Sequence, residues 1–115
     1  AQEELGKAVD DDGTSKVLVV QSMLDYQNGN INASSENLLK GLNSPSLTQA
    51  SYDLAMEQGI VIRDHYIGET EKNLSKADKS AAINSFKKAK AWCSVFPEMD
   101  CPDELFERLR VQLVD

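Results

Sequence analysis

The sequence predicts an all-α fold, a small bundle of about five helices packed as helical hairpins. Apolar residues recur three or four places apart through most of the chain, as they do along the buried stripe of an amphipathic helix. Residues that end helices, including those at positions 28–30 and 43–45, separate these runs. A chain of 115 residues is long enough for one core, so we expect a single helical domain over residues 1–115.

In the first third of the chain, the pattern predicts three helices. A short helix over residues 2–8 is followed by an acidic turn at residues 10–13, which caps a second helix over residues 14–28. Glycine and asparagine at residues 28–30 then accept the left-handed conformation that ends helices. A further short helix over residues 34–42 is expected to end at the following Asn-Ser-Pro sequence.

The acidic turn has a calcium-binding alternative. In an EF-hand loop with Gly13 at its sixth position, Asp10 and Asp12 fall at the third and fifth positions, where oxygen ligands are needed. Ala8 and Val19 then fall at the first and twelfth positions and offer no side-chain oxygen. The missing ligands favour an acidic helix cap over a calcium site.

The central helix is predicted from a capping box. Ser46 is followed three residues later by Gln49, so their side chains can satisfy each other's backbone N–H groups at a helix start. Apolar residues then continue to Tyr66, and we predict that the helix does so as well. Gly59 disfavours a helix interior, so the alternative is a break or kink near it. The polar residues 69–78 are expected to contain the connection to the next helix.

Residues 80–113 contain two amphipathic runs on either side of an acidic turn. Pro102, with Asp103 and Glu104 after it, is typical of a helix start, because proline is tolerated in the first turn and acidic groups favour the positive end of the helix dipole. The turn brings Cys93 near Cys101, and we expect a disulfide between them. The alternative is a pair of reduced thiols that pack in the interior.

Part of the chain resembles the tetratricopeptide repeat. After the Tyr-Gln-Asn-Gly-Asn-Ile sequence at residues 26–31, small, large and small residues precede a proline in the order of that family. The residues carrying this match are Ser34, Leu38, Gly41 and Pro45. The same order recurs at Ala82, Phe86, Ala89 and Pro97, starting 82 − 34 = 48 residues later, whereas the family repeats at about 34.

The resemblance implies stacked helical hairpins whose grooves bind peptides or partner proteins. The preceding helices depart from the family, because Gln21 and Ser22 stand where its leucine-glycine pair would fall and its tryptophan is missing. An alternative explanation is that any helical hairpin with small residues at its crossing points gives this pattern.

The charge balance limits the possible partners. The chain has 12 Lys and Arg against 19 Asp and Glu, a net charge of −7. An anionic surface repels nucleic-acid phosphates, so we expect no nucleic-acid binding. No apolar run approaches the ~20 residues of a membrane-spanning helix, and we expect no membrane span.

Catalytic signals are weak, and we predict a protein that is not an enzyme and has no cofactor or metal. The only histidine, His65, would share a helix face with Glu69, but two ligands from one segment make a poor metal site. The sequence has no Gly-x-Ser-x-Gly, no Cys-x-x-Cys and no phosphate-binding glycine loop. A small hydrolase or metal-dependent enzyme using His65 is the less favoured alternative.

We therefore predict a non-enzymatic module that binds another protein with a basic surface, in an oligomeric state that the sequence leaves open. The predicted contact surface has acidic residues around an apolar centre: Asp10, Asp11, Asp12, Ile31, Phe96 and Met99. The apolar members could instead complete the core. The cysteines favour a secreted or periplasmic inhibitor or immunity-type protein, whereas the hairpins favour a cytoplasmic scaffold.

Overall fold

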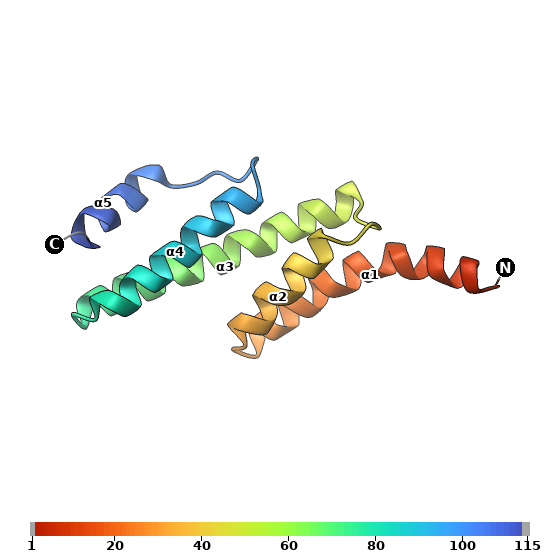
Figure 1. Ribbon diagram of the computed structural model, residues 1–115, viewed down its shortest axis with the longest axis horizontal. Coiled ribbons are helices and arrows are strands. Elements are labelled where there is room, and N and C mark those ends of the chain that lie inside the picture. Colours follow the sequence, from red (N-terminus) through yellow and green to blue (C-terminus); the bar gives the residue numbers. More distant parts are fainter. Residues whose placement is uncertain (1, 114–115) are drawn as a thin grey trace. The chain divides into compact units, whose positions relative to one another are not determined.

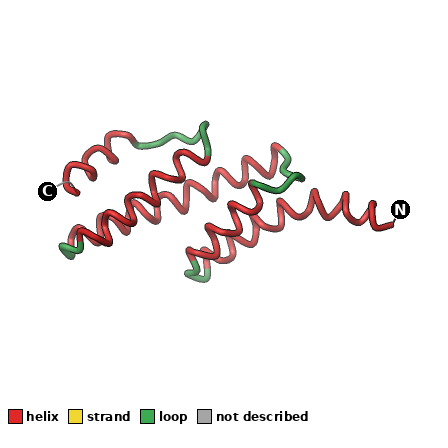
Figure 2. Tube along the Cα trace, in the orientation of Figure 1, coloured by secondary structure: helices red, strands yellow, loops and turns green. Residues whose placement is uncertain are grey.

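The computed structural model describes the backbone of residues 2–113 and the side chains of residues 14–113, and it confirms the all-α class. The described residues form five helices joined by short loops (Figures 1 and 2). They are α1 (Gln2–Gln27), α2 (Ile31–Leu42), α3 (Gln49–Ser75), α4 (Lys79–Val95) and α5 (Asp103–Leu113). The contacts divide the chain into two compact units, Ala1–Gly59 (unit 1) and Ile60–Asp115 (unit 2). Whether the chain folds as a single domain stays a prediction.

One expected interruption is absent from the helices. The predicted acidic turn at residues 10–13 was wrong, since α1 continues through these positions. The predicted continuation of the central helix past Gly59 was confirmed, since α3 runs through this residue. Aspartate and glycine in a helix interior cost at most about 1 kcal/mol each. Extending an existing helix fixes only one residue for each backbone hydrogen bond gained, so residues of low helix propensity need not stop it.

Helix α1 ends at the predicted glycine turn. Gly29 has a φ of +80°, and the N–H groups of Gly29 and Asn30 donate to the carbonyl oxygens of Tyr26 (3.0 Å) and Asp25 (2.8 Å). These two bonds form a Schellman motif, which satisfies carbonyl groups at the helix end. The Asn30 side chain then accepts from the N–H of Ala33 and caps α2, which therefore begins before the predicted residue 34.

The turn between α3 and α4 repeats this arrangement 48 residues later. Ala77 occupies the left-handed position with a φ of +61°, and Asp78 caps α4 by accepting from the N–H of Ala81. The N–H groups of Ala77 and Asp78 donate to the carbonyl oxygens of Leu74 and Asn73 in a second Schellman motif. The connection is thus confined to residues 76–78, inside the polar segment 69–78 that was predicted to contain it.

Buried positions of the two hairpins also correspond at this spacing. In α1–α2 and in α3–α4, the residues that the fold buries match in six pairs: Ser15 and Arg63, Val19 and Ile67, Ser22 and Thr70, Ser34 and Ala82, Leu38 and Phe86, Gly41 and Ala89. The small-large-small order noted in the sequence therefore marks structurally equivalent positions. Each unit is built around one helical hairpin with the same turn and the same buried face.

The start of α3 differs from the predicted cap. The Thr48 hydroxyl, rather than that of Ser46, accepts from a backbone N–H of the first turn, that of Ser51, at 3.1 Å. Ser46 instead pairs with the Ser44 hydroxyl within the preceding loop at 2.7 Å. Both serines and the threonine can cap, so the choice depends on the path of the loop.

Candidate interaction surface and the disulfide loop

In unit 1, small hydroxyl residues form the contact between α1 and α2. The Ser22 hydroxyl donates to the Ser34 carbonyl oxygen (2.6 Å), and the Ser34 hydroxyl donates back to the Ser22 carbonyl oxygen (2.6 Å). Seven residues away on each helix, the Ser15 hydroxyl donates to the Gly41 carbonyl oxygen (2.9 Å). All these hydroxyls are fully buried, and each has a hydrogen-bond partner, which offsets the cost of burying a polar group. We call these four residues the serine seam.

Close approach of the backbones makes the serine seam possible. A Cβ atom added at Gly41 would lie 3.1 Å from the Ser15 carbonyl oxygen and 3.2 Å from a Val19 methyl carbon. Nothing larger than glycine fits here without movement of a neighbour. Sequence reasoning identified Gly41 only as part of a repeat-like pattern, and it missed the buried role of the serines because serine is mostly a surface residue.

In unit 2, larger side chains fill the region that corresponds to the serine seam of unit 1. Phe86 of α4 meets Phe106 of α5 edge to face, with ring centroids 5.7 Å apart, and Trp92 stacks with Phe96 at 6.3 Å. The Thr70 hydroxyl, equivalent to that of Ser22, donates to the Tyr66 carbonyl oxygen of its own helix, and Ala82, equivalent to Ser34, has no hydroxyl to donate back across the hairpin. The ammonium of Lys88 lies 5.5 Å from the Tyr66 ring centroid and links α4 to α3.

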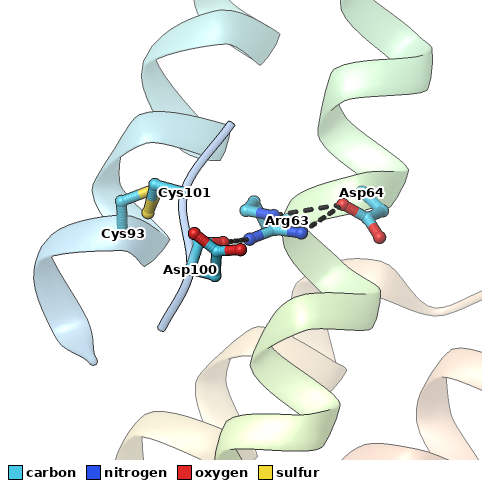
Figure 3. Close-up of a disulfide and its surroundings, with 5 residues drawn as sticks. All are labelled: Arg63, Asp64, Cys93, Asp100 and Cys101. Carbon is cyan, nitrogen blue, oxygen red and sulfur yellow. Dashed lines mark hydrogen bonds and ion pairs between the residues drawn. A yellow bond between two sulfur atoms is a disulfide. The ribbon is translucent and has the colours of Figure 1, made fainter. Parts of the chain in front are cut away.

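The loop between α4 and α5 is held at two points (Figure 3). Cys93 and Cys101 are paired as a disulfide, as predicted, with Cα atoms 6.0 Å apart. Beside it, the guanidinium of Arg63 reaches from α3 and donates through Nη1 to the Asp100 carbonyl oxygen at 2.6 Å. Nε and Nη2 of the same group donate to the Asp64 carboxylate at 3.0 and 2.8 Å, so the buried cation is balanced.

The residues predicted to contact a partner do not come together as one surface in the described part of the chain. Phe96 is fully buried and Met99 is 6% exposed, so these side chains complete the core of unit 2, which was the alternative that the sequence left open. Ile31 is half-buried at the start of α2. Asp10, Asp11 and Asp12 lie on α1, and their side chains fall outside the described residues.

His65 lies half-buried on α3, where its ring meets that of Tyr66 edge to face at 5.4 Å. Among the described side chains, no three His, Cys, Asp or Glu groups gather as a potential metal site. None of the helices formed by the described residues combines the length and apolar character needed to cross a membrane.

An exposed apolar surface that the sequence analysis did not single out lies on α1. Val17, Val20 and Leu24 are 63%, 39% and 47% exposed, and their spacing of three and four residues places them on one face of the helix. We call these three residues the α1 stripe. Their presence within the apolar run of residues 14–28 was the available signal, but periodicity alone assigned such residues to the core.

Charge is distributed unevenly between the units. Unit 1 contains three Lys and Arg against nine Asp and Glu, a net charge of 3 − 9 = −6, whereas unit 2 contains nine against ten, a net charge of 9 − 10 = −1. Almost all of the excess acidity therefore belongs to the unit that also carries the α1 stripe. The net charge of the whole chain does not reveal this uneven distribution, although the sequence contains it.

Comparison with known proteins gives no family for this chain. No family model matches the sequence, and neither the curated proteins nor the solved structures contain a significant match.

Proposed function

We propose that this chain is a non-enzymatic protein-binding module and that unit 1 carries its contact surface for a basic partner. The observation that carries this proposal is the net charge of −6 in unit 1, which coincides with three exposed aliphatic side chains on α1. An apolar centre within a charged surface is a common composition for protein interfaces. The charge mainly accelerates the encounter with an oppositely charged partner.

Two settings fit this activity, and each has its own support. The Cys93–Cys101 disulfide supports a secreted or periplasmic inhibitor or immunity-type protein, because such bonds persist in oxidising compartments. The two helical hairpins support a scaffold, because such hairpins offer surfaces for partner proteins. Alkylation in the native compartment, followed by intact mass measurement, separates them: a protected cysteine pair supports the first setting, and two alkylated thiols support the second.

A pull-down from the native compartment, followed by kinetic titration, tests the binding proposal. We expect a retained basic protein whose association rate falls as salt is raised, since screening weakens steering between opposite charges. Replacing Asp10, Asp11 and Asp12 by Asn should slow association several-fold. The matched control neutralises three acids of unit 2 through Glu71→Gln, Glu98→Gln and Glu104→Gln.

The control removes the same formal charge from the unit that carries little of the excess. If both triple variants slow association equally, the contact surface is not in unit 1. If the association rate does not change with salt, the acidic surface does not guide binding, and a His65→Ala variant should then be assayed for loss of a hydrolytic activity.

A further inference from the structure

Helix α1 has an unusual distribution of polarity. It turns Ser15, Val19 and Ser22 toward the hairpin contact, and positions 17, 20 and 24 lie about 170° around the helix from them. A surface helix ordinarily turns its apolar residues inward and its polar residues outward. Here hydroxyl groups form much of the buried contact, and three aliphatic side chains of the α1 stripe are exposed.

The second hairpin serves as an internal control for the α1 stripe. The positions 48 residues after Val17, Val20 and Leu24 are His65, Gly68 and Lys72 on α3, and Gly68 and Lys72 are exposed. The same hairpin therefore forms with a polar residue, a glycine and a cation at these positions. Because the fold does not need apolar side chains there, the α1 stripe is not explained by packing within its own hairpin.

Charge on the same helix indicates what could cover the α1 stripe. Asp10 and Glu3 are seven and fourteen residues before Val17, and residues seven apart in a helix share a face. Two acidic positions thus precede the α1 stripe at the same helical register, within a unit whose net charge is −6. An occupant that matches both features has an apolar stripe at helical spacing and basic residues beyond one end of it.

We propose that the α1 stripe and the acidic positions before it bind an amphipathic helix of another protein, one with apolar residues three and four places apart and a basic flank. This inference rests on the proposed function and specifies how the partner binds. The partner helix lies along α1, with its apolar residues on Val17, Val20 and Leu24 and its Lys or Arg residues near Asp10 and Glu3.

A designed peptide tests this docking directly. The probe is a labelled peptide of about 18 residues, made of Leu and Lys, with the leucines at helical spacing and extra lysines at one end; it would span about 27 Å as a helix. A second peptide has the same composition in an order without an apolar stripe. Fluorescence anisotropy is measured for both peptides against the full chain at low and high salt.

Two variants locate the binding site on the chain. The double variant Val17→Ser with Leu24→Ser removes the ends of the α1 stripe, and Leu39→Ser removes an aliphatic side chain that is similarly exposed, at 40%, on α2. All three positions are exposed, so circular dichroism should show unchanged helix content. We expect the amphipathic peptide to bind about tenfold more weakly to the double variant and equally well to Leu39→Ser.

The outcomes separate this inference from the proposed function. If both peptides bind equally and salt weakens both, the acidic surface of unit 1 binds basic chains, but the helix-docking inference is overturned. Unchanged affinity in the double variant also overturns it. If light scattering shows a dimer that the double variant converts to a monomer, a second copy covers the α1 stripe, and the inference is again overturned.

Discussion

The two units share one helical-hairpin fold but differ in the side chains at its buried positions. Unit 1 closes its hairpin with serines and a glycine, exposes aliphatic residues and has a net charge of −6. Unit 2 fills the equivalent layer with aromatic rings, adds a disulfide and a buried arginine, and is close to neutral. The hairpin fold itself comes from a turn and a pattern of small buried residues that both units share.

This difference predicts how stability is divided between the two units. Large apolar side chains contribute far more to folding through burial than hydroxyl groups do, so unit 2 should hold most of the stability. Unit 1 places its aliphatic residues on the surface, where they contribute little to its own fold. The following substitutions test this division, from the largest expected effect to the smallest.

The largest effect is expected in the aromatic core of unit 2. Phe106 is 6% exposed and contacts Phe86, so Phe106→Ala should lower the free energy of unfolding by about 3–5 kcal/mol through lost burial and a cavity. Chemical denaturation measures the change. Val111→Ala on the same helix is the control, since Val111 is 53% exposed, and its effect should be small. Similar losses in both variants would mean that α5 contributes little to the core.

Removing the disulfide should have the next largest effect. Cys93 and Cys101 are eight residues apart, and closing so short a loop stabilises a protein by about 2.5 kcal/mol on the chain-entropy model. The double variant Cys93→Ser with Cys101→Ser should lower the melting temperature as much as a reductant does to the parent protein. Hydrogen exchange should show faster exchange in unit 2 first. A uniform increase over both units would contradict the division of stability between them.

A large residue at Gly41 tests the close packing of unit 1. Gly41→Leu places a side chain against the Ser15 carbonyl and Val19, and we expect a loss of about 1–3 kcal/mol in the free energy of unfolding. Gly68→Leu is the matched control on α3, because a Cβ there meets no atom within 4 Å. Denaturation midpoints that respond equally to both changes would show that the serine seam is not tightly packed.

Exchanging glycine and alanine at the left-handed positions of the two turns should change the free energy of unfolding least, and in opposite directions. Ala77→Gly relieves a left-handed alanine and should stabilise the chain by about 0.5–1 kcal/mol, after the greater unfolded-state freedom of glycine is included. Gly29→Ala imposes the same conformation on an alanine and should destabilise by about 1 kcal/mol. Thermal melts measure both. Changes of the same sign would show that the two turns are not equivalent.

Local signals predicted much of the fold. The glycine turn before Asn30, the helix start near Pro102 and the approach of Cys93 to Cys101 all depend on residues close in sequence, and the structure contains each of them. Weak local signals misled where tertiary or cooperative effects were stronger. The acidic residues 10–13 do not form a turn, because a continuous α1 keeps its backbone hydrogen bonds through them.

The candidate surface could not be read from the sequence in the same way. Periodicity shows that residues share a helix face but not which face is buried. In α1 the serines of the seam are buried, whereas Val17 and Leu24 are exposed. Phe96 and Met99 were taken as surface groups because they flank a turn, yet the disulfide loop folds them into the core. The two faces of α1 become distinguishable only once the partner helix α2 is in place.

The serine seam also specifies how α1 and α2 align. A purely apolar contact between two helices tolerates a shift along the helix axis. The hydrogen bonds of Ser22 with Ser34 and of Ser15 with Gly41 form together only in one antiparallel register. If α2 slid by seven residues so that Gly41 met Ser22, Ser34 would lie beyond the end of α1 and Ser15 would face the loop after α2. In the misaligned hairpin, these hydroxyl groups would lose their hydrogen-bond partners. The Ser22–Ser34 contact and the Ser15–Gly41 contact therefore define the register of the hairpin together.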